Sequence, residues 1–222
     1  MKPLMRAYPM FVSLEGRTCL VVGAGRVGRR KVDTLTAFGA GDIHVLDSQP
    51  AEFGPNVRFE ARPFADADLD GVFLAFCCTS DRTLNERIGR LCRERGILCN
   101  VADDPELSTF TVPATVRQGE LTLAISTGGH SPALSKRLRQ ELENHFGERY
   151  GRFITLLGRV RALVLALGEE TEHNSDVFRA LVDSRLLDAL ERRDTVLAGE
   201  ELRRVLPSDL HGSITEILDG LV

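Results

Sequence analysis

The spacing of apolar residues changes between strand-like and helix-like several times over the first half of the chain. Short apolar runs typical of buried strands lie at residues 19–22, 43–46, 72–78 and 97–101, with a weaker one at 57–60. Amphipathic stretches with helical spacing lie between them, at residues 27–38 and 81–95. This alternation predicts a Rossmann-like, doubly wound α/β sheet of parallel strands, in which ligands bind beyond the carboxyl ends of the strands.

The pattern changes near residue 112, which we take as a domain boundary. Residues 110–116 and 121–125 have the spacing of two strands joined by a turn, which predicts a hairpin. Ser131 and Pro132 then form a typical helix start, and every later strong pattern is helical. Helices are expected at residues 132–146, 150–167, 174–191, 198–205 and 212–221.

The stretch at residues 150–167 carries apolar side chains three or four positions apart, so one face of that helix must be buried. Burial in the core of the chain and burial in a dimer interface both remain open. Because this face and the strand pair at 110–125 together exceed what one small domain can easily cover, we expect a homodimer built from this half of the chain. The arginines of this stretch are most simply placed on a solvated face; they are Arg149, Arg152, Arg159 and Arg161.

Three glycines follow the first strand with the spacing G-x-G-x-x-G, at Gly23, Gly25 and Gly28. Gly23 permits a tight turn, Gly25 lets a pyrophosphate reach backbone N–H groups, and Gly28 lets the helix pack closely on the strand. Arg26 and Val27 lie where the helix begins and belong to the predicted cofactor site. The motif alone is weak, but its position between a strand and an amphipathic helix predicts dinucleotide binding. The alternative is a Gly-rich turn without a ligand.

Two further segments complete the predicted cofactor site at the same edge of the sheet. Asp47 ends the second strand, 19 residues past Gly28, where an acid would hold a ribose hydroxyl. Its charge would repel a 2′-phosphate, so we expect NAD rather than NADP. Thr79 and Ser80 follow the strand at 72–78 and reach the same edge.

The segment Asn100–Asp104 ends the strand at 97–101 and includes two adjacent acids, Asp103 and Asp104. A carboxylate at this edge could act as a general base or acid beside a bound nicotinamide. Adjacent acids before a proline are also ordinary turn formers, so the spacing alone leaves both interpretations open.

The loop before the helix at 132–146 is rich in small and hydroxyl residues. It comprises Ser126, Thr127, Gly128, Gly129, His130 and Ser131. Free N–H groups and the helix dipole at such a loop suit a carboxylate or phosphate, and nearby cations add positive charge, namely Lys136, Arg137 and Arg139. The alternative is a flexible turn, in which a lone histidine is more often a surface residue than a ligand.

Composition narrows the range of partners and the compartment. The net charge of −4 and the pI near 5.8 argue against nucleic acid as the main partner. No apolar run approaches the roughly 20 residues of a membrane span, and no signal peptide is expected at the start, so no membrane partner is expected.

The cysteines lie in apolar runs without C-x-x-C spacing, which predicts buried, reduced thiols in a cytoplasmic protein. The histidines are scattered, so no metal site is expected.

Five segments, in this order, resemble the precorrin-2 dehydrogenase family, the N-terminal half of siroheme synthases. They are Tyr8–Phe11, Gly23–Lys31, Cys99–Pro105, Phe110 with Pro113, and Ile125–Leu134. The resemblance is close over residues 8–146 and is one of character only after residue 150. The family often has Gly-Gly-Gly where this chain has Gly23-Ala24-Gly25, and Ala where it has Gly28; both changes bring the chain nearer to the general dinucleotide motif. Many relatives lack an acid at position 47. The predicted role of Asp47 therefore rests on the general Rossmann argument.

The resemblance implies three parts and one reaction. The parts would be an NAD-binding Rossmann domain at residues 1–112, a dimerisation region with a tetrapyrrole-binding loop at 113–148, and a helical domain at 149–222. The reaction would be the oxidation of precorrin-2 to sirohydrochlorin with NAD⁺, by a homodimer, in sirohaem biosynthesis.

The resemblance also assigns residues. Asp103 matches the family's catalytic aspartate, and Asp104 is its variable neighbour. Asn100 and the loop at 126–131, with Thr127 at the family's hydroxyl position, would bind the tetrapyrrole.

Two alternatives remain open. The enzyme could also insert Fe²⁺ into sirohydrochlorin, an activity that leaves no readable metal motif in a sequence. The chain could instead be a non-catalytic, NAD-sensing regulatory module. The segments at 99–105 and 125–134 argue against a sensor, because a sensor needs neither a carboxylate nor an anion-binding loop there.

Overall fold

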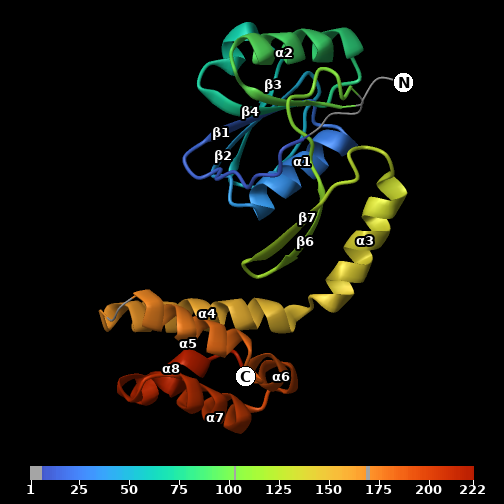
Figure 1. Ribbon diagram of the computed structural model, residues 1–222. Helices are drawn as coiled ribbons and strands as arrows, with labels where there is room; N and C mark the ends of the chain where they lie inside the picture. The colour runs from blue at the N-terminus through green and yellow to red at the C-terminus, as the bar shows by residue number, and fades with distance from the viewer. Residues whose placement is uncertain (1–6, 103, 169–170) are drawn as a thin grey trace. The chain divides into compact units, whose positions relative to one another are not determined.

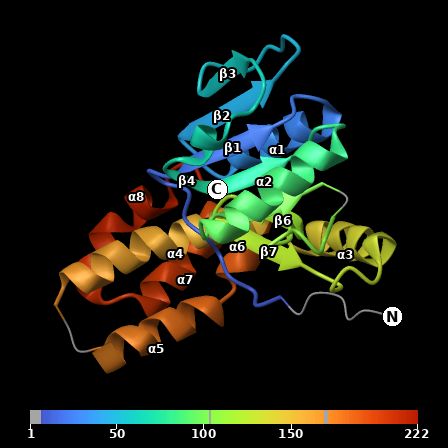
Figure 2. The ribbon, with the colours of Figure 1, turned by 90° about the horizontal axis from the view of Figure 1, so that it is seen from above.

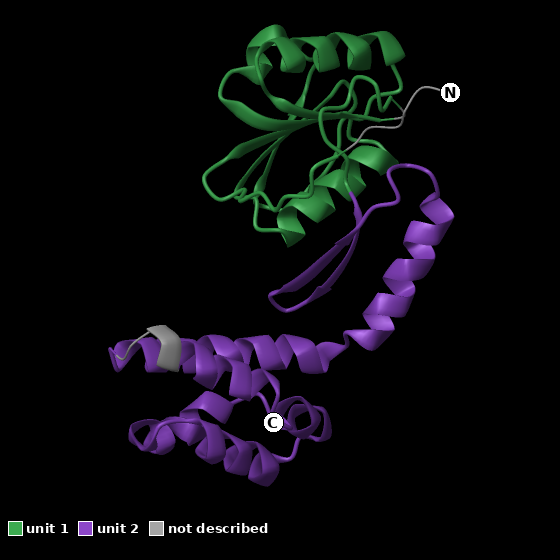
Figure 3. Ribbon diagram, in the orientation of Figure 1, with its two compact units in different colours: residues 1–112 green, residues 113–222 purple. Residues whose placement is uncertain are grey.

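The computed structural model describes residues 7–102, 104–168 and 171–222. The chain divides into two compact units, residues 1–112 and residues 113–222 (Figure 3). Unit 1 is an α/β unit and unit 2 combines a hairpin with helices.

Unit 1 contains a five-stranded sheet in the order β3-β2-β1-β4-β5, and each neighbouring pair is parallel (Figures 1 and 2). Its strands are β1 Thr18–Val22, β2 Asp42–Asp47, β3 Val57–Ala61, β4 Val72–Cys77 and β5 Leu98–Val101. Helix α1 (Arg26–Ala37) covers one face and helix α2 (Arg82–Glu94) the other. The strand order reverses between β1 and β4, so the carboxyl ends of these strands flank the crevice where dinucleotides bind. The predicted Rossmann-like fold class is confirmed.

Each face of the sheet contributes to its own core, which explains why the strands are apolar on both sides. The core under α1 includes Cys19, Val21, Val32, Leu35, Ile43, Val45 and Phe76. The core under α2 includes Leu20, Val22, Leu46, Cys77, Ile88, Cys92 and Cys99. Five free cysteines are present, but the predicted burial is wrong for Cys78, which is half-buried because it lies just past the end of β4. Burial, with a smaller effect of Asp42, raises the pKa of the Cys19 thiol to about 11.

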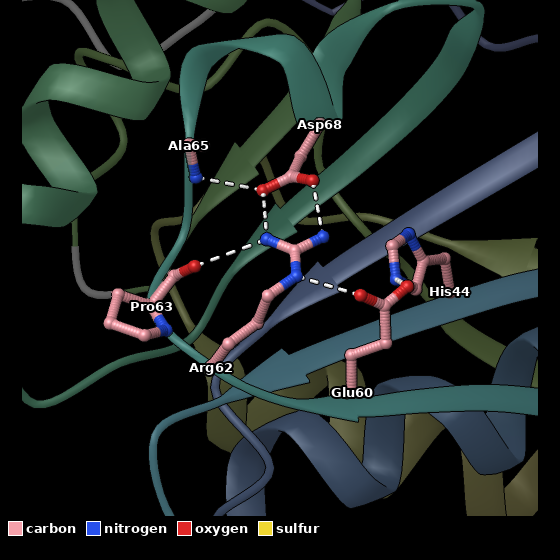
Figure 4. Close-up of polar contacts among 6 residues, drawn as sticks. All are labelled: His44, Glu60, Arg62, Pro63, Ala65 and Asp68. Atoms are coloured by element: carbon pink, nitrogen blue, oxygen red, sulfur yellow. Dashed lines mark hydrogen bonds and ion pairs between the residues drawn. The ribbon is translucent and has the colours of Figure 1, made fainter.

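A cluster of charged side chains fixes the connection from β3 to β4 (Figure 4). The Arg62 guanidinium donates to both Asp68 oxygens, at 2.9 and 2.6 Å, and its Nε donates to Glu60 Oε2 at 2.7 Å. Asp68 lies in the short 3-10 helix η1 (Asp66–Leu69) and also accepts from the Ala65 N–H at 2.7 Å. The buried His44 Nε2 lies 2.9 Å from Glu60 Oε1 without the alignment of a hydrogen bond. The cluster therefore joins β2 and β3 to η1, which lies in the connection that leads to β4.

Unit 2 begins with an antiparallel hairpin of β6 (Ala114–Gln118) and β7 (Leu121–Ile125). The predicted first strand at 110–116 starts too early. Residues before Ala114 instead bind back along β5, since the Thr109 N–H donates to the Cys99 carbonyl at 2.8 Å and Asn100 Nδ2 donates to the Phe110 carbonyl at 3.2 Å. The helices that follow are α3 Pro132–His145, α4 Glu148–Ala166, α5 Thr171–Val182, α6 Leu186–Arg192, α7 Thr195–Val205 and α8 Ile214–Leu218, with the 3-10 helix η2 Ser208–Ser213.

The helices of unit 2 enclose their own core and correct three predictions. The apolar stripe of α4 is buried within the chain, as Leu156 and Val160 show, so core packing explains it. The predicted helix at 174–191 is two helices, because the Ser184 hydroxyl donates to the Leu181 carbonyl and accepts from the Leu186 N–H. The predicted helix at 212–221 is largely the 3-10 helix η2 followed by the short α8.

Two negative findings concern the part of the chain that the structure describes. None of its helices is both long and apolar enough to cross a membrane. Within the same residues, no group of three or more His, Cys, Asp or Glu side chains could hold a metal ion.

Candidate functional site

The turn after β1 is built so tightly that two of its glycines cannot carry a side chain. Gly23 has a φ of +104°, and a Cβ there would lie 2.6 Å from the Cys78 carbonyl carbon and 2.7 Å from the Thr79 nitrogen. A Cβ at Gly28 would lie 1.8 Å from the Gly23 carbonyl oxygen. The turn, the start of α1 and the end of β4 are therefore held in direct backbone contact.

Gly25 differs from these glycines because it faces open space. A Cβ added there would meet nothing within 4 Å. Gly25 is also the N-cap of α1, and no side chain caps the helix. The first N–H groups of the helix, at Arg26, Val27 and Gly28, have no carbonyl partners within it. Open space beside uncapped N–H groups suits the pyrophosphate of a dinucleotide, so the residues of this turn fit such a cofactor.

Asp47 is bound to the same turn. Its Oδ2 accepts from the Ala24 N–H at 2.7 Å, and its Oδ1 accepts from the Gln49 N–H at 2.9 Å. Each carboxylate oxygen has a second lone pair, so both can still accept from ribose hydroxyls. The sequence did not reveal that this carboxylate also fixes the glycine turn, and its contact with a ribose stays a prediction.

The half-buried Lys31 lies on α1, one turn past Gly28, and was not singled out from the sequence. Its Nζ lies 4.9 Å from the centre of the Phe76 ring, at the end of β4. Burial lowers the pKa of the Lys31 ammonium. Phe76 in turn contacts the edge of Phe110, with 5.6 Å between ring centres. A cation and two aromatic rings thus adjoin the carboxyl end of β4.

Thr79 and Ser80, both predicted cofactor residues, lie in the connection between β4 and α2. The Thr79 backbone contacts the Gly23 turn, as the distance above shows, whereas Ser80 is exposed. Asn85 was missed. It is 6% exposed and is hydrogen-bonded to Thr79. A polar residue on the apolar face of a predicted helix was the signal that could have found it.

The segment after β5 contains the predicted acids. Asp103 lies outside the described residues. Asp104 acts as a turn former, because its Oδ1 accepts from the Glu106 and Leu107 N–H groups at 3.1 and 3.2 Å. The Asn100 amide is held by the Phe110 carbonyl, as described above, and its Oδ1 leaves an acceptor for a ligand.

The loop at residues 126–131 belongs to unit 2 and is ordered by Thr127. The Thr127 hydroxyl accepts from the Ser131 N–H at 3.2 Å and lies 3.0 Å from the Ser135 hydroxyl. Gly128 and Gly129 have φ values of +60° and +80°, which let the chain turn ahead of α3. Ser131 caps α3 by accepting from the Leu134 N–H at 3.1 Å, as predicted.

The positive charge expected beside this loop is smaller than the sequence indicated. Arg137 pairs with Glu141 at 2.7 Å, and Arg139 pairs with Glu143 at 2.6 Å. Both acids lie one turn further along α3 and partly neutralise these cations. Lys136 and His130 are exposed. Anion binding by this loop stays a prediction, to which its backbone N–H and hydroxyl groups could contribute.

Comparison with known proteins first defines the class. A family model for NAD(P)-binding domains matches residues 10–114, and one for the central part of sirohaem biosynthesis proteins matches residues 118–145. Together with the glycine turn, the first match makes unit 1 a nicotinamide-dinucleotide-binding Rossmann domain.

Similar proteins then define the family. The siroheme synthase of Thioalkalivibrio sulfidiphilus is 33% identical over 93% of this chain and 43% of its own length. That of Escherichia coli O1:K1 / APEC is 32% identical over 96% of this chain and 48% of its own length. The solved structure of SirC, precorrin-2 dehydrogenase, has a TM-score of 0.71 and 25% identity, covering 90% of this chain and 98% of that one. The chain belongs to the precorrin-2 dehydrogenase and siroheme synthase family, and it spans about half the length of these siroheme synthases.

Proposed function

We propose that this protein is an NAD-dependent dehydrogenase that oxidises precorrin-2 to sirohydrochlorin on the route to sirohaem. The observation that carries the proposal is the open, uncapped start of α1 beside Gly25, in a chain similar to a precorrin-2 dehydrogenase over almost all of that protein's length. The balanced reaction is precorrin-2 plus NAD⁺ to sirohydrochlorin, NADH and a proton.

The residues of unit 1 would bind and orient the dinucleotide. The N–H groups of Arg26, Val27 and Gly28 would donate to the pyrophosphate, in the space that Gly25 leaves open. The bound nicotinamide would supply the redox chemistry by accepting a hydride. Thr79 and Ser80 would line the nicotinamide half of the dinucleotide site. They follow β4, which lies across the reversal in strand order from β2 and its Asp47.

We propose NAD rather than NADP because of Asp47. Its carboxylate is held beside the glycine turn by two N–H donors and lies at the end of β2, where the adenosine ribose is bound in Rossmann domains. A 2′-phosphate there would bring two negative groups together. Ribose hydroxyls would instead donate to the carboxylate.

Substrate binding and proton transfer are assigned to the remaining predicted residues. The loop from Ser126 to Ser131 would donate hydrogen bonds to carboxylates of the tetrapyrrole, which carries eight of them. Asn100 would offer its amide oxygen. Asp103 would accept the proton that is lost as the hydride leaves, or stabilise the developing positive charge.

A homodimer in the cytoplasm is also proposed. The α4 stripe no longer supports a dimer, because the chain itself covers it. Helix α3 does support one, since none of its side chains is fully buried and Leu134 is 46% exposed. Five free thiols suit a reducing compartment. Light scattering at micromolar concentration tests the assembly, and a monomer would contradict it.

The test of function is turnover, followed as NADH formation from precorrin-2 and NAD⁺ under anaerobic conditions. Binding of NAD⁺ without turnover would favour the regulatory module instead. Addition of Fe²⁺ or Co²⁺ to sirohydrochlorin, with the metal as substrate, tests the chelatase alternative separately.

A further inference from the structure

We propose that Asn85 is a positioning residue, which holds the β4–α2 loop (residues 78–81) in the form that binds the nicotinamide dinucleotide. The inference rests on the proposed function only in that unit 1 binds this cofactor. It assigns a role to a buried amide that neither the glycine motif nor the predicted site includes.

The location of Asn85 is unusual for a polar side chain. It lies in the first turns of α2 and is 6% exposed, on the same face as Ile88 and Cys92, which are fully buried. A buried amide is costly unless its donors and acceptor are paired. Asn85 therefore occupies a core position at which an apolar residue would be the simpler choice.

The amide is paired with both backbone groups of a single residue. Asn85 Nδ2 donates to the Thr79 carbonyl at 3.0 Å, and the Thr79 N–H donates to Asn85 Oδ1 at 3.3 Å. The Thr79 hydroxyl also donates to Oδ1, at 2.8 Å, and it accepts from the Asp81 N–H at 3.1 Å. Of the side chains of this size, only an amide can both donate and accept in this way.

Helix capping does not explain these bonds. Asp81 is the N-cap of α2, and its side chain accepts from the Leu84 N–H at 3.1 Å. The helix start is thus satisfied without Asn85. The hydrogen bonds of Asn85 act on the loop ahead of the cap.

The loop in turn touches the glycine turn. The Cys78 N–H donates to the Val22 carbonyl at 2.7 Å, which extends the sheet by one residue. The Thr79 nitrogen would lie 2.7 Å from a Cβ at Gly23, so no space separates the two backbones. Asn85 holds Thr79, the residue that follows this last sheet hydrogen bond. A shift of Thr79 would move the loop against the glycine turn, where the pyrophosphate is proposed to bind. Loss of Asn85 should weaken dinucleotide binding more than it weakens the fold.

The test compares Asn85→Leu and Asn85→Asp with Ile88→Val. Asn85→Leu removes every bond to Thr79, whereas Asn85→Asp keeps the acceptor oxygen and loses the donor to the Thr79 carbonyl. Ile88→Val trims a buried neighbour on the same face of α2 without touching the loop. Calorimetric titration gives the Kd for NAD⁺, thermal unfolding gives Tm, and steady-state kinetics give KM for NAD⁺ and kcat.

We expect Asn85→Asp, which loses one hydrogen bond, to raise the Kd and KM for NAD⁺ by roughly ten-fold. Asn85→Leu, which loses three, should raise both values at least as much, and kcat at saturating NAD⁺ should stay nearly unchanged in both variants. Ile88→Val should lower Tm and leave the Kd unchanged. If Asn85→Leu does not fold, Asn85→Asp, which keeps the size and shape of the side chain, decides the matter by the same comparison of Kd and Tm.

Folded Asn85 variants with the Kd of the original protein would overturn the proposal, as would an equal rise of the Kd in Ile88→Val. The failure of the proposed function is distinguishable. If the original protein binds NAD⁺ but does not oxidise precorrin-2, the Kd comparison still decides the role of Asn85. If it binds neither NAD⁺ nor NADP⁺, both proposals are overturned.

Discussion

The substitution Asp47→Asn tests how the carboxylate at the end of β2 selects the cofactor. Asp47 accepts from the Ala24 and Gln49 N–H groups through its two oxygens. An asparagine keeps one acceptor, and its NH₂ group would face one of the two N–H donors. One backbone bond is therefore lost together with the charged acceptor for the ribose.

The expected size of the effect follows from these bonds. A hydrogen bond to a charged group contributes about 1.5–3 kcal/mol. Loss of the charged acceptor for the ribose should therefore raise the Kd for NAD⁺ roughly 10- to 150-fold. The Kd for NADP⁺ should rise less, because the repulsion of the 2′-phosphate disappears, so the ratio of the two values should fall.

Calorimetric titration of both dinucleotides provides the assay, and Asp42→Asn is the matched control. Asp42 lies at the opposite end of β2, where its Oδ2 accepts from the Thr18 hydroxyl at 2.6 Å. The control should leave both Kd values unchanged. If Asp47→Asn is folded and the ratio of the NADP⁺ and NAD⁺ Kd values stays the same, Asp47 does not contact the ribose and the selection of NAD has another origin.

Three further predictions concern the turn, the proposed acid–base group and the ion cluster. Gly25→Val should fold, because the space beside it is open, but should abolish detectable NAD⁺ binding by calorimetry, because the side chain would occupy the pyrophosphate position; binding of normal strength would place the pyrophosphate elsewhere. Asp103→Asn should cut turnover about 10²- to 10⁴-fold with NAD⁺ binding intact, while Asp104→Asn should act mainly on stability; equal kinetic effects would remove Asp103 from proton transfer. Burial lowers the pKa of His44, so between its folded pKa and about 6.5 the unfolded state binds more protons and stability falls as the pH falls. Urea titrations at pH 5 and pH 7.5 should show a smaller pH effect for His44→Gln, and an unchanged pH effect would assign the acid sensitivity to other groups.

The sequence was most informative where local pattern and tertiary contact agree. The G-x-G-x-x-G spacing located the turn because Gly23 and Gly28 each meet a backbone atom that excludes a side chain. Ser131 and Pro132 identified the start of α3 because a helix start depends on its own first turn. Such features are encoded within a few residues.

Other features depend on residues far apart in the chain and could not be predicted. Arg159 was expected on a solvated face, yet its guanidinium donates to the Ile217 and Asp219 carbonyls at 2.9 and 2.7 Å. The break at Ser184 depends on a hydroxyl that competes with helical hydrogen bonds, which the apolar periodicity does not record. The role of Asn85 likewise depends on a loop that is defined only once the sheet has formed.

The most direct test of the central claim is the stoichiometry of oxidation. Purified protein is incubated with precorrin-2 and NAD⁺ without oxygen, and NADH and sirohydrochlorin are measured by absorbance. We expect one NADH for each sirohydrochlorin, at a rate that is lower in the Gly25→Val variant. Sirohydrochlorin formed without NADH, or no product from a protein that binds NAD⁺ normally, would contradict it.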